Sequence, residues 1–137
     1  MKTNVSVDIV KNTDMTFTTE WKSDDIGYYM SAHLDMIADE DAWEIIFMKL
    51  DYENDSHLDA KHAIDVFSHV GKSILLLVKI KKPKIIFFHG ATLRLEKVYK
   101  RFAPMLSKVL PQYDYKYEEL PLSHLKHHIF IRKGNKI

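Results

Sequence analysis

The sequence predicts an α+β fold in which a mixed, mostly antiparallel sheet of about seven strands is covered by two main helices. Three observations lead to this prediction. Alternating apolar and polar residues, typical of strands, dominate the first 51 positions. Helical spacing of apolar residues replaces this alternation twice, on either side of a short apolar strand. Two further strand-like segments finish the chain. The predicted order is therefore β-β-β-β-α-β-α-β-β.

Four strands are expected first, as an antiparallel meander. Alternation marks the first three, around residues 5–9, 15–21 and 28–36, with a hairpin turn at 11–14. The fourth, from Trp43 to about residue 51, is apolar on both faces. It should therefore be central in the sheet and covered on both sides.

The first helix is expected from about residue 58 to the Lys-rich segment 79–84, where Pro83 ends it. Its polar face should carry four residues at helical spacing: His62, Asp65, His69 and Lys72. A buried strand follows at 85–88, and the helical crossover makes it parallel and adjacent to the fourth strand.

The second helix should begin near Thr92 and run to Pro111, with a kink or break at Pro104 because proline cannot donate to the carbonyl four residues earlier. Strands are then expected at 113–120 and 124–133. The first of these places Tyr113, Tyr115 and Tyr117 on one face.

Length and composition set the broad class. The 137 residues predict one domain, 1–137, with an ordinary share of hydrophobic residues, 46%. The chain has no cysteine, so a thiolate metal site is not available, and we expect a cytoplasmic protein. The longest apolar run, Ile74–Val78, is far shorter than the ~20 residues of a membrane span.

Charge is divided unevenly along the chain. Residues 1–68 carry five lysines against fifteen acidic residues, a net −10, whereas residues 69–137 carry fifteen basic against four acidic residues, a net +11. Three interpretations stay open: the halves neutralise each other, the basic half binds phosphate or nucleic acid, or copies of the chain associate.

From the meander onward, this order of elements resembles the GNAT N-acetyltransferase superfamily. The segment "RLEKVYKRFAPML", 94–106, looks like the family's late helix, in which a tyrosine protonates the departing coenzyme A thiolate. The resemblance implies acetyl-CoA as cofactor and Tyr99 as that acid. His33 or Glu44, on the two strands that border the acceptor side in this family, would be the base. The alternative for these residues is structural: Tyr99 in the helix core, and His33 and Glu44 facing solvent.

Two departures from the GNAT pattern bear on activity. The family's cofactor loop follows the fourth strand with Gln/Arg-x-x-Gly-x-Gly/Ala, whereas the matching segment here, "DYENDSHLDAKH", is acidic and contains no glycine. The two helices that the family places between its first two strands have no room in residues 11–14. A looser likeness, in "FSHVGKSILLLVKIKKPKIIFFHGATLRLEKVYKRF", is to small phage-encoded proteins.

One further candidate is an anion site at the turn between the 85–88 strand and the second helix. It would comprise His89, Gly90, Thr92 and Arg94, because free N–H groups at a helix start attract phosphate. The alternative is a plain connection capped by Thr92. No metal site is expected, because the histidines of "SHLKHH" point to both faces of a strand.

Three functional hypotheses follow. The first is a non-enzymatic binding or accessory protein on an acetyltransferase-like fold, with a protein partner or a second copy of itself. The second is an acetyl-CoA-dependent N-acetyltransferase. The third is a nucleic-acid-binding protein that uses the basic C-terminal half.

Overall fold

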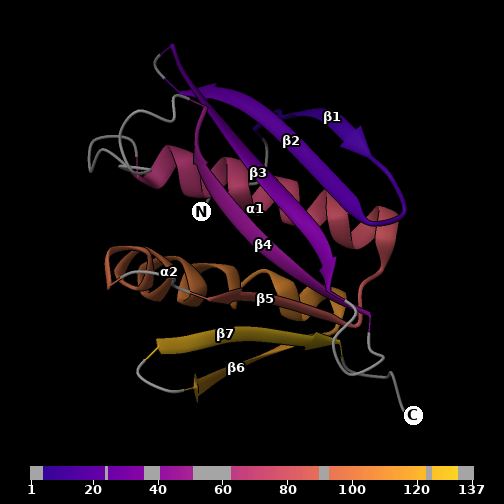
Figure 1. Ribbon diagram of the computed structural model, residues 1–137, viewed down its shortest axis with the longest axis vertical. Coiled ribbons are helices and arrows are strands. Elements are labelled where there is room, and N and C mark those ends of the chain that lie inside the picture. Colours follow the sequence, from indigo (N-terminus) through magenta and orange to yellow (C-terminus); the bar gives the residue numbers. More distant parts are fainter. Residues whose placement is uncertain are drawn as a thin grey trace. The chain divides into compact units, whose positions relative to one another are not determined.

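The computed structural model describes residues 5–23, 25–35, 41–50, 63–89, 93–122 and 125–132. Seven strands, two α-helices and a short 3-10 helix are described (Figure 1). Their bounds are β1 Asp8–Asn12, β2 Thr16–Ser23, β3 Ile26–Asp35, β4 Ala42–Lys49, α1 Ala63–Lys81, β5 Ile85–His89, α2 Leu93–Leu106, η3 Leu110–Tyr113, β6 Tyr115–Leu122 and β7 Leu125–Arg132.

The strands form one mixed sheet in the order β1-β2-β3-β4-β5-β7-β6. β4 and β5 are parallel, and the β1–β2, β2–β3, β5–β7 and β6–β7 pairs are antiparallel. The α+β class, the order of elements and the parallel β4–β5 pair are therefore as predicted.

The chain divides into two compact units. One comprises residues 1–33 and 45–80, and the other residues 34–44 and 81–137. The division passes through β4, whose first three residues, Ala42 to Glu44, pair with Ile85 to Phe87 of β5. The prediction that residues 1–137 form one domain stays a prediction.

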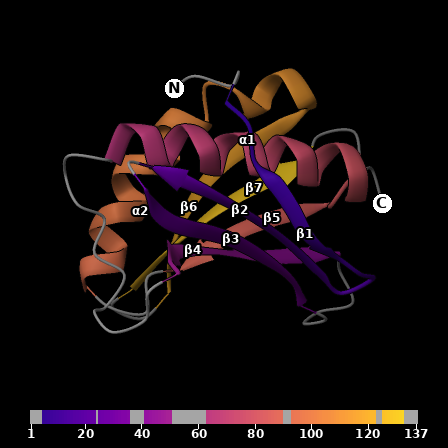
Figure 2. The ribbon, with the colours of Figure 1, turned by 90° about the horizontal axis from the view of Figure 1, so that it is seen from above.

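The first unit has its core between α1 and one face of β2 and β3, as the views from the front and from above both show (Figures 1 and 2). Val66, Val70 and Ile74 recur at helical spacing and are buried, because this spacing keeps them on one face of α1. From β2, alternate residues such as Phe17 and Trp21 are buried against the helix.

The second unit has its core between α2 and strands β5 and β7. Phe88 of β5 is fully buried and meets Phe102 of α2 and Phe130 of β7 edge-on, with ring centroids 5.8 and 6.1 Å apart. Leu106 of α2 and Leu110 of η3 complete this buried set. An aromatic cluster therefore fixes the helix on the strands.

Several predicted boundaries are wrong. β1 begins at Asp8 and continues through Lys11 and Asn12, because the Thr13 side chain closes the turn by accepting from the backbone N–H of Thr16 at 3.1 Å. α2 ends at Leu106, two residues after Pro104, and the chain tightens into η3 before β6. Tyr113 lies in η3, so it does not share a strand face with Tyr115 and Tyr117.

Two predictions about faces are also wrong. β4 is central, but only Trp43, Ile45 and Phe47 are buried, while Ile46 and Met48 on its other face are half-buried. His69, predicted on the polar face of the first helix, is 9% exposed. The start of that helix, near residue 58, lies outside the described residues.

Candidate functional site

His33 lies on β3 and is exposed, which both the predicted base and the solvent-facing alternative allow. Its Nε2 atom is 3.0 Å from the Ser31 hydroxyl, which in turn is 3.1 Å from the hydroxyl of Thr18 on β2. These hydroxyls hold the imidazole on the sheet face that points away from α1. An imidazole held this way can accept a proton from an amine.

Glu44 is a half-buried residue of β4, and its backbone pairs with Phe87. It belongs to the second unit, whereas His33 belongs to the first. The role of base stays a prediction for each of the two residues.

The remaining predicted site residues are placed by their backbones only. Tyr99 and Arg94 lie on α2, and His89 is the last residue of β5, where it pairs with His127. Gly90 and Thr92 lie outside the described residues. Their predicted roles as acid and anion ligands stay predictions.

A pocket of about 370 Å³ opens in the first unit, on the sheet face that points away from α1. Asp8 of β1 lies directly opposite Glu20 of β2, and Lys22 lies opposite Gly27 of β3, so their side chains share this face. The remaining lining residues are Ser6, Trp21 and Leu50.

Three charged side chains line this pocket, and a glycine leaves room for one of its apolar side chains. Like charges directly opposite each other on neighbouring strands are unfavourable, and Lys22 only partly offsets Asp8 and Glu20. Gly27 leaves the space that Leu50 fills, since a Cβ atom there would come within 2.7 Å of the Leu50 Cδ1 atom. The charged side chains that line this pocket are therefore two carboxylates and one ammonium group.

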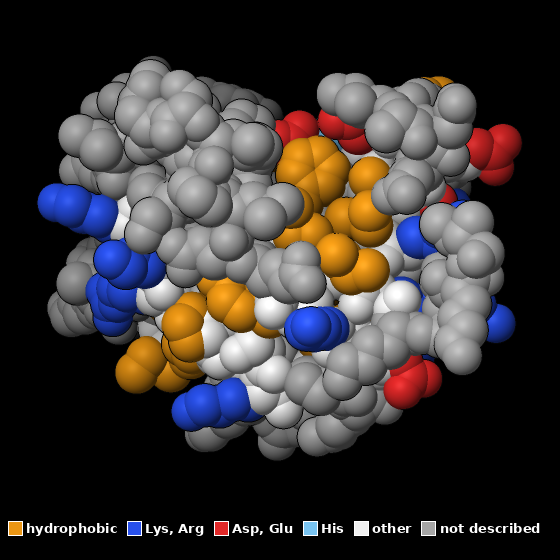
Figure 3. Space-filling view, turned by 90° about the horizontal axis from the view of Figure 1, so that it is seen from below, with side chains coloured by type: hydrophobic (Ala, Val, Ile, Leu, Met, Phe, Trp, Pro, Cys, Tyr) orange, Lys and Arg blue, Asp and Glu red, His pale blue; other side chains and the backbone are white. Residues whose placement is uncertain are grey.

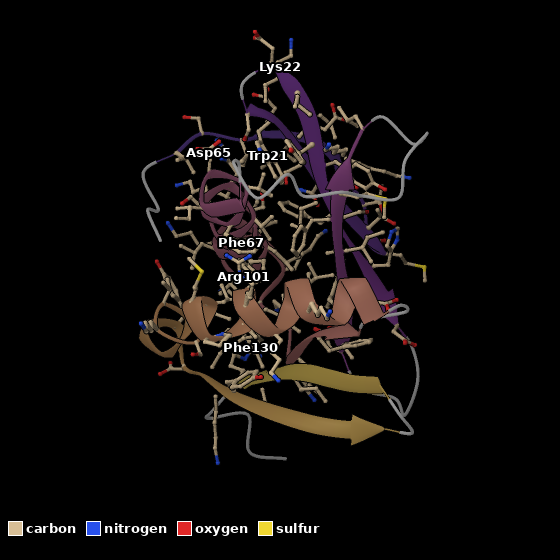
Figure 4. The ribbon with its side chains drawn as sticks, turned by 90° about the vertical axis from the view of Figure 1, so that its left-hand side faces the viewer. Trp21, Lys22, Asp65, Phe67, Arg101 and Phe130 are labelled. Carbon is tan, nitrogen blue, oxygen red and sulfur yellow. The ribbon has the colours of Figure 1, made fainter. Side chains whose placement is uncertain are left out.

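A polar cluster joins the start of α1 to the end of β2. The Ser23 hydroxyl donates to the Asp65 carboxylate, and the His69 Nδ1–H donates to the Asp65 carbonyl at 2.7 Å. The imidazole is stacked on Trp21, with ring centroids 5.4 Å apart and planes within 6°. Figure 4 labels Trp21 and Asp65, which lie near each other in this cluster.

The cluster anchors the helix and lacks the arrangement of a catalytic triad. In a triad the hydroxyl bonds to the imidazole, whereas here Ser23 bonds to a carboxylate and His69 to a backbone carbonyl. Sequence analysis missed this cluster, although the spacing of Asp65 and His69, four residues apart, was a usable signal.

No group of three or more His, Asp or Glu side chains among the described residues is arranged to hold a metal ion. Within the same residues, neither helix is long and apolar enough to cross a membrane.

Comparison with solved structures identifies the architecture. The chain matches the structure of AAC(6')-Ib in complex with ribostamycin and coenzyme A, with a TM-score of 0.53 and 10% sequence identity. AAC(6')-Ib is a GNAT acetyltransferase. The fold is GNAT-like. The match covers 88% of this chain and 65% of the AAC(6')-Ib chain.

At this identity, the GNAT-like likeness is one of fold and does not extend to activity. No protein-family model matches the chain, and no curated protein matches it. The looser likeness to phage-encoded proteins finds no support in these comparisons.

Proposed function

We propose that this chain is a binding or accessory protein that uses the GNAT-like fold without transferring an acetyl group. The observation that carries the proposal is the link between the first two strands, which consists of residues 13–15 alone. In the family that the sequence resembles, two helices fill this position and help to form the acceptor site.

The cofactor side gives a second argument. The chain has no glycine between Gly27 and Gly71, so the segment that follows β4 lacks the residue that lets backbone N–H groups close around a diphosphate. That segment also carries four carboxylates in residues 51–62, and these repel phosphate. The residues present therefore do not fit coenzyme A.

A protein partner is the expected ligand, because the outer edge of β1 has no neighbouring strand in the described sheet. All five residues of β1 are exposed, including Ile9 at 44% and Val10 at 50%. An open edge with exposed apolar side chains is a template for pairing with another chain.

Calorimetry with acetyl-CoA tests the proposal directly. We expect no binding at up to about 1 mM cofactor, which corresponds to a binding free energy weaker than about −4 kcal/mol. A panel of primary amines incubated with acetyl-CoA and the protein should release no free thiol. Micromolar binding of acetyl-CoA would contradict the proposal.

The second candidate is an acetyl-CoA-dependent N-acetyltransferase, with His33 or Glu44 as base and Tyr99 as acid. It is supported by the GNAT-like fold and by the exposed His33 imidazole. If transfer is observed, Tyr99→Phe should lower its rate by about 10²–10⁴-fold, the usual contribution of a positioned proton donor. Tyr113→Phe, a half-buried tyrosine of η3, is the matched control.

A further inference from the structure

The exposed face of α2 carries three cations. Lys97, Lys100 and Arg101 are exposed, and at about 3.6 residues per turn they lie within an arc of about 100° around the helix axis. Phe102 and Leu106 occupy the opposite arc and are buried in the core of the second unit. Figure 4 labels Arg101 on this helix. The core therefore fixes the rotation of α2 about its axis, with the three cations turned outward.

A fourth cation extends this row beyond the end of α2. The backbone N–H of Ser107 donates to the Ala103 carbonyl at 2.9 Å, and that of Lys108 donates to the Met105 carbonyl at 3.3 Å. These bonds continue the helix as a tighter turn in which Lys108 is exposed, so the row of cations is about 16 Å long. We name these four residues, Lys97, Lys100, Arg101 and Lys108, the basic stripe.

The charge of the basic stripe is not neutralised by the described side chains. None of its four cations forms an ion pair with another residue in the part of the chain that the structure describes. Residues 93–109 contain five basic residues and a single acidic residue, Glu96. Figure 3 shows Lys and Arg side chains at several places on the surface seen from below. Four positive charges on one face therefore attract an anionic ligand.

We propose that the basic stripe binds the phosphate backbone of a double-stranded nucleic acid. A duplex carries one negative charge per about 1.7 Å of its axis, so a row of cations about 16 Å long can contact several phosphates at once. Each contact releases condensed counterions and adds to the affinity without reading the base sequence. The proposal goes beyond the protein partner proposed above and does not depend on the outcome of the acetyl-CoA experiment.

Two other anionic ligands fit the basic stripe less well. Proteins that bind single strands stack aromatic side chains on the bases, and no described aromatic side chain of α2 is exposed. Binding in the surface of an anionic membrane needs large apolar side chains beside the cations. Among the described side chains of α2, the only exposed apolar one is Pro104, because Phe102 and Leu106 are buried in the core.

Fluorescence anisotropy with a labelled DNA duplex of about 16 base pairs tests this site. If all four cations contact phosphate, the logarithm of the binding constant should fall with the logarithm of salt concentration with a slope of about −3.6. Affinity should then drop about 100-fold between about 50 and 200 mM salt. A duplex of the same length and a different sequence should bind equally well.

Matched charge reversals locate the site. Lys97→Glu/Arg101→Glu should weaken binding by at least about tenfold and reduce the slope to about −2. Lys72→Glu/Lys79→Glu makes the same change of net charge on α1 of the first unit and should leave binding within about twofold. Lys97→Arg/Arg101→Lys keeps both charges and should bind as the unmodified protein does. Circular dichroism and urea unfolding verify that the variants are folded.

Several results would overturn the proposal: no binding at about 50 mM salt, binding that does not respond to salt, or equal weakening by the two Glu variants. Tighter binding of a single strand of the same length would overturn the assignment to a duplex.

Two further measurements separate other partners from nucleic acid. If the unmodified protein ignores the duplex and Lys97→Glu/Arg101→Glu converts a dimer to a monomer in light scattering, the basic stripe is an interface between copies. If the unmodified protein ignores the duplex and sediments with vesicles of phosphatidylcholine and phosphatidylserine, the basic stripe binds a membrane surface. Either result would replace the proposal.

Discussion

At the scale of single residues, Tyr115 shows how burial changes the pKa of a side chain. Its ring is 1% exposed, and its hydroxyl donates to the Pro83 carbonyl. Burial raises the pKa of Tyr115 to about 12, with nearby Arg132 acting to lower it and Asp41 acting to raise it. The neutral phenol is therefore strongly favoured in the folded protein.

The raised pKa predicts a loss of stability in alkali. Tyr115 keeps its proton in the folded state between pH 10 and about 12, where the unfolded chain releases it. The free energy of unfolding should therefore be unaffected by this group below pH 10 and should fall as the pH rises toward 12.

Urea unfolding at a series of pH values, compared with Tyr115→Phe, measures this effect. The variant should lack the Tyr115 part of the alkaline slope and should lose about 1–3 kcal/mol at neutral pH, because the Pro83 carbonyl is left without its donor. Identical slopes for the two proteins would contradict the pKa assignment. Tyr113→Phe is again the control.

At the scale of elements, α1 is fixed on β2 by a buried pair of hydroxyl groups. The Ser73 hydroxyl donates to the His69 carbonyl at 2.9 Å and lies 2.6 Å from the Thr19 hydroxyl. Because the Ser73 hydrogen is already used, Thr19 must be the donor within the pair.

With Thr19 as the donor and Ser73 as the acceptor, we expect the two single substitutions to lower the free energy of unfolding by different amounts. Ser73→Ala removes the acceptor of the fully buried Thr19 hydroxyl and should cost about 1–3 kcal/mol. Thr19→Val leaves Ser73 bonded to His69 and should cost about 1 kcal/mol or less. A double-mutant cycle measured by urea unfolding should give a double variant less destabilised than the two single changes added together. A Thr19→Val cost above that of Ser73→Ala would reverse the assignment.

Elements with a clear period were predictable from sequence, and their ends were less so. Alternation in β2 and helical spacing in α1 both reflect burial on one face, so they are visible without coordinates. The predicted end of α2 at Pro111 was wrong: the helix ends at Leu106, two residues after Pro104, which cannot donate to the carbonyl four residues earlier.

The candidate sites were harder to predict than the fold. His69 was assigned to the polar face, yet its ring stacks on Trp21 and its polar atom bonds to its own helix, so burial costs it little. The pocket depends on cross-strand neighbours, such as Asp8 with Glu20, which only the register of two strands reveals.

At the scale of the whole molecule, β4 belongs to both compact units. Residues Ala42–Glu44 pair with β5 in one unit, and residues from Ile45 onward belong to the other. We expect a fragment of residues 81–137 to be unstable, because Ile85 to Phe87 would lose their parallel neighbour and present an open edge.

Near-ultraviolet circular dichroism and urea unfolding of two fragments measure this dependence. Fragment 34–137 keeps all of the second unit and should unfold cooperatively, whereas fragment 81–137 should show no cooperative transition. A sharp transition for fragment 81–137 would show that its strands do not need Ala42–Glu44.

The strand that both units share also limits how such a gene can be rearranged. Each unit is interrupted in the sequence by part of the other, so a single recombination junction cannot transfer either unit without also transferring part of the other. Exchange between related genes would have to replace both segments of a unit at once, or leave β4 paired with strands from a different gene. Diversity in this lineage should therefore accumulate by point substitution and by changes at the surface turns.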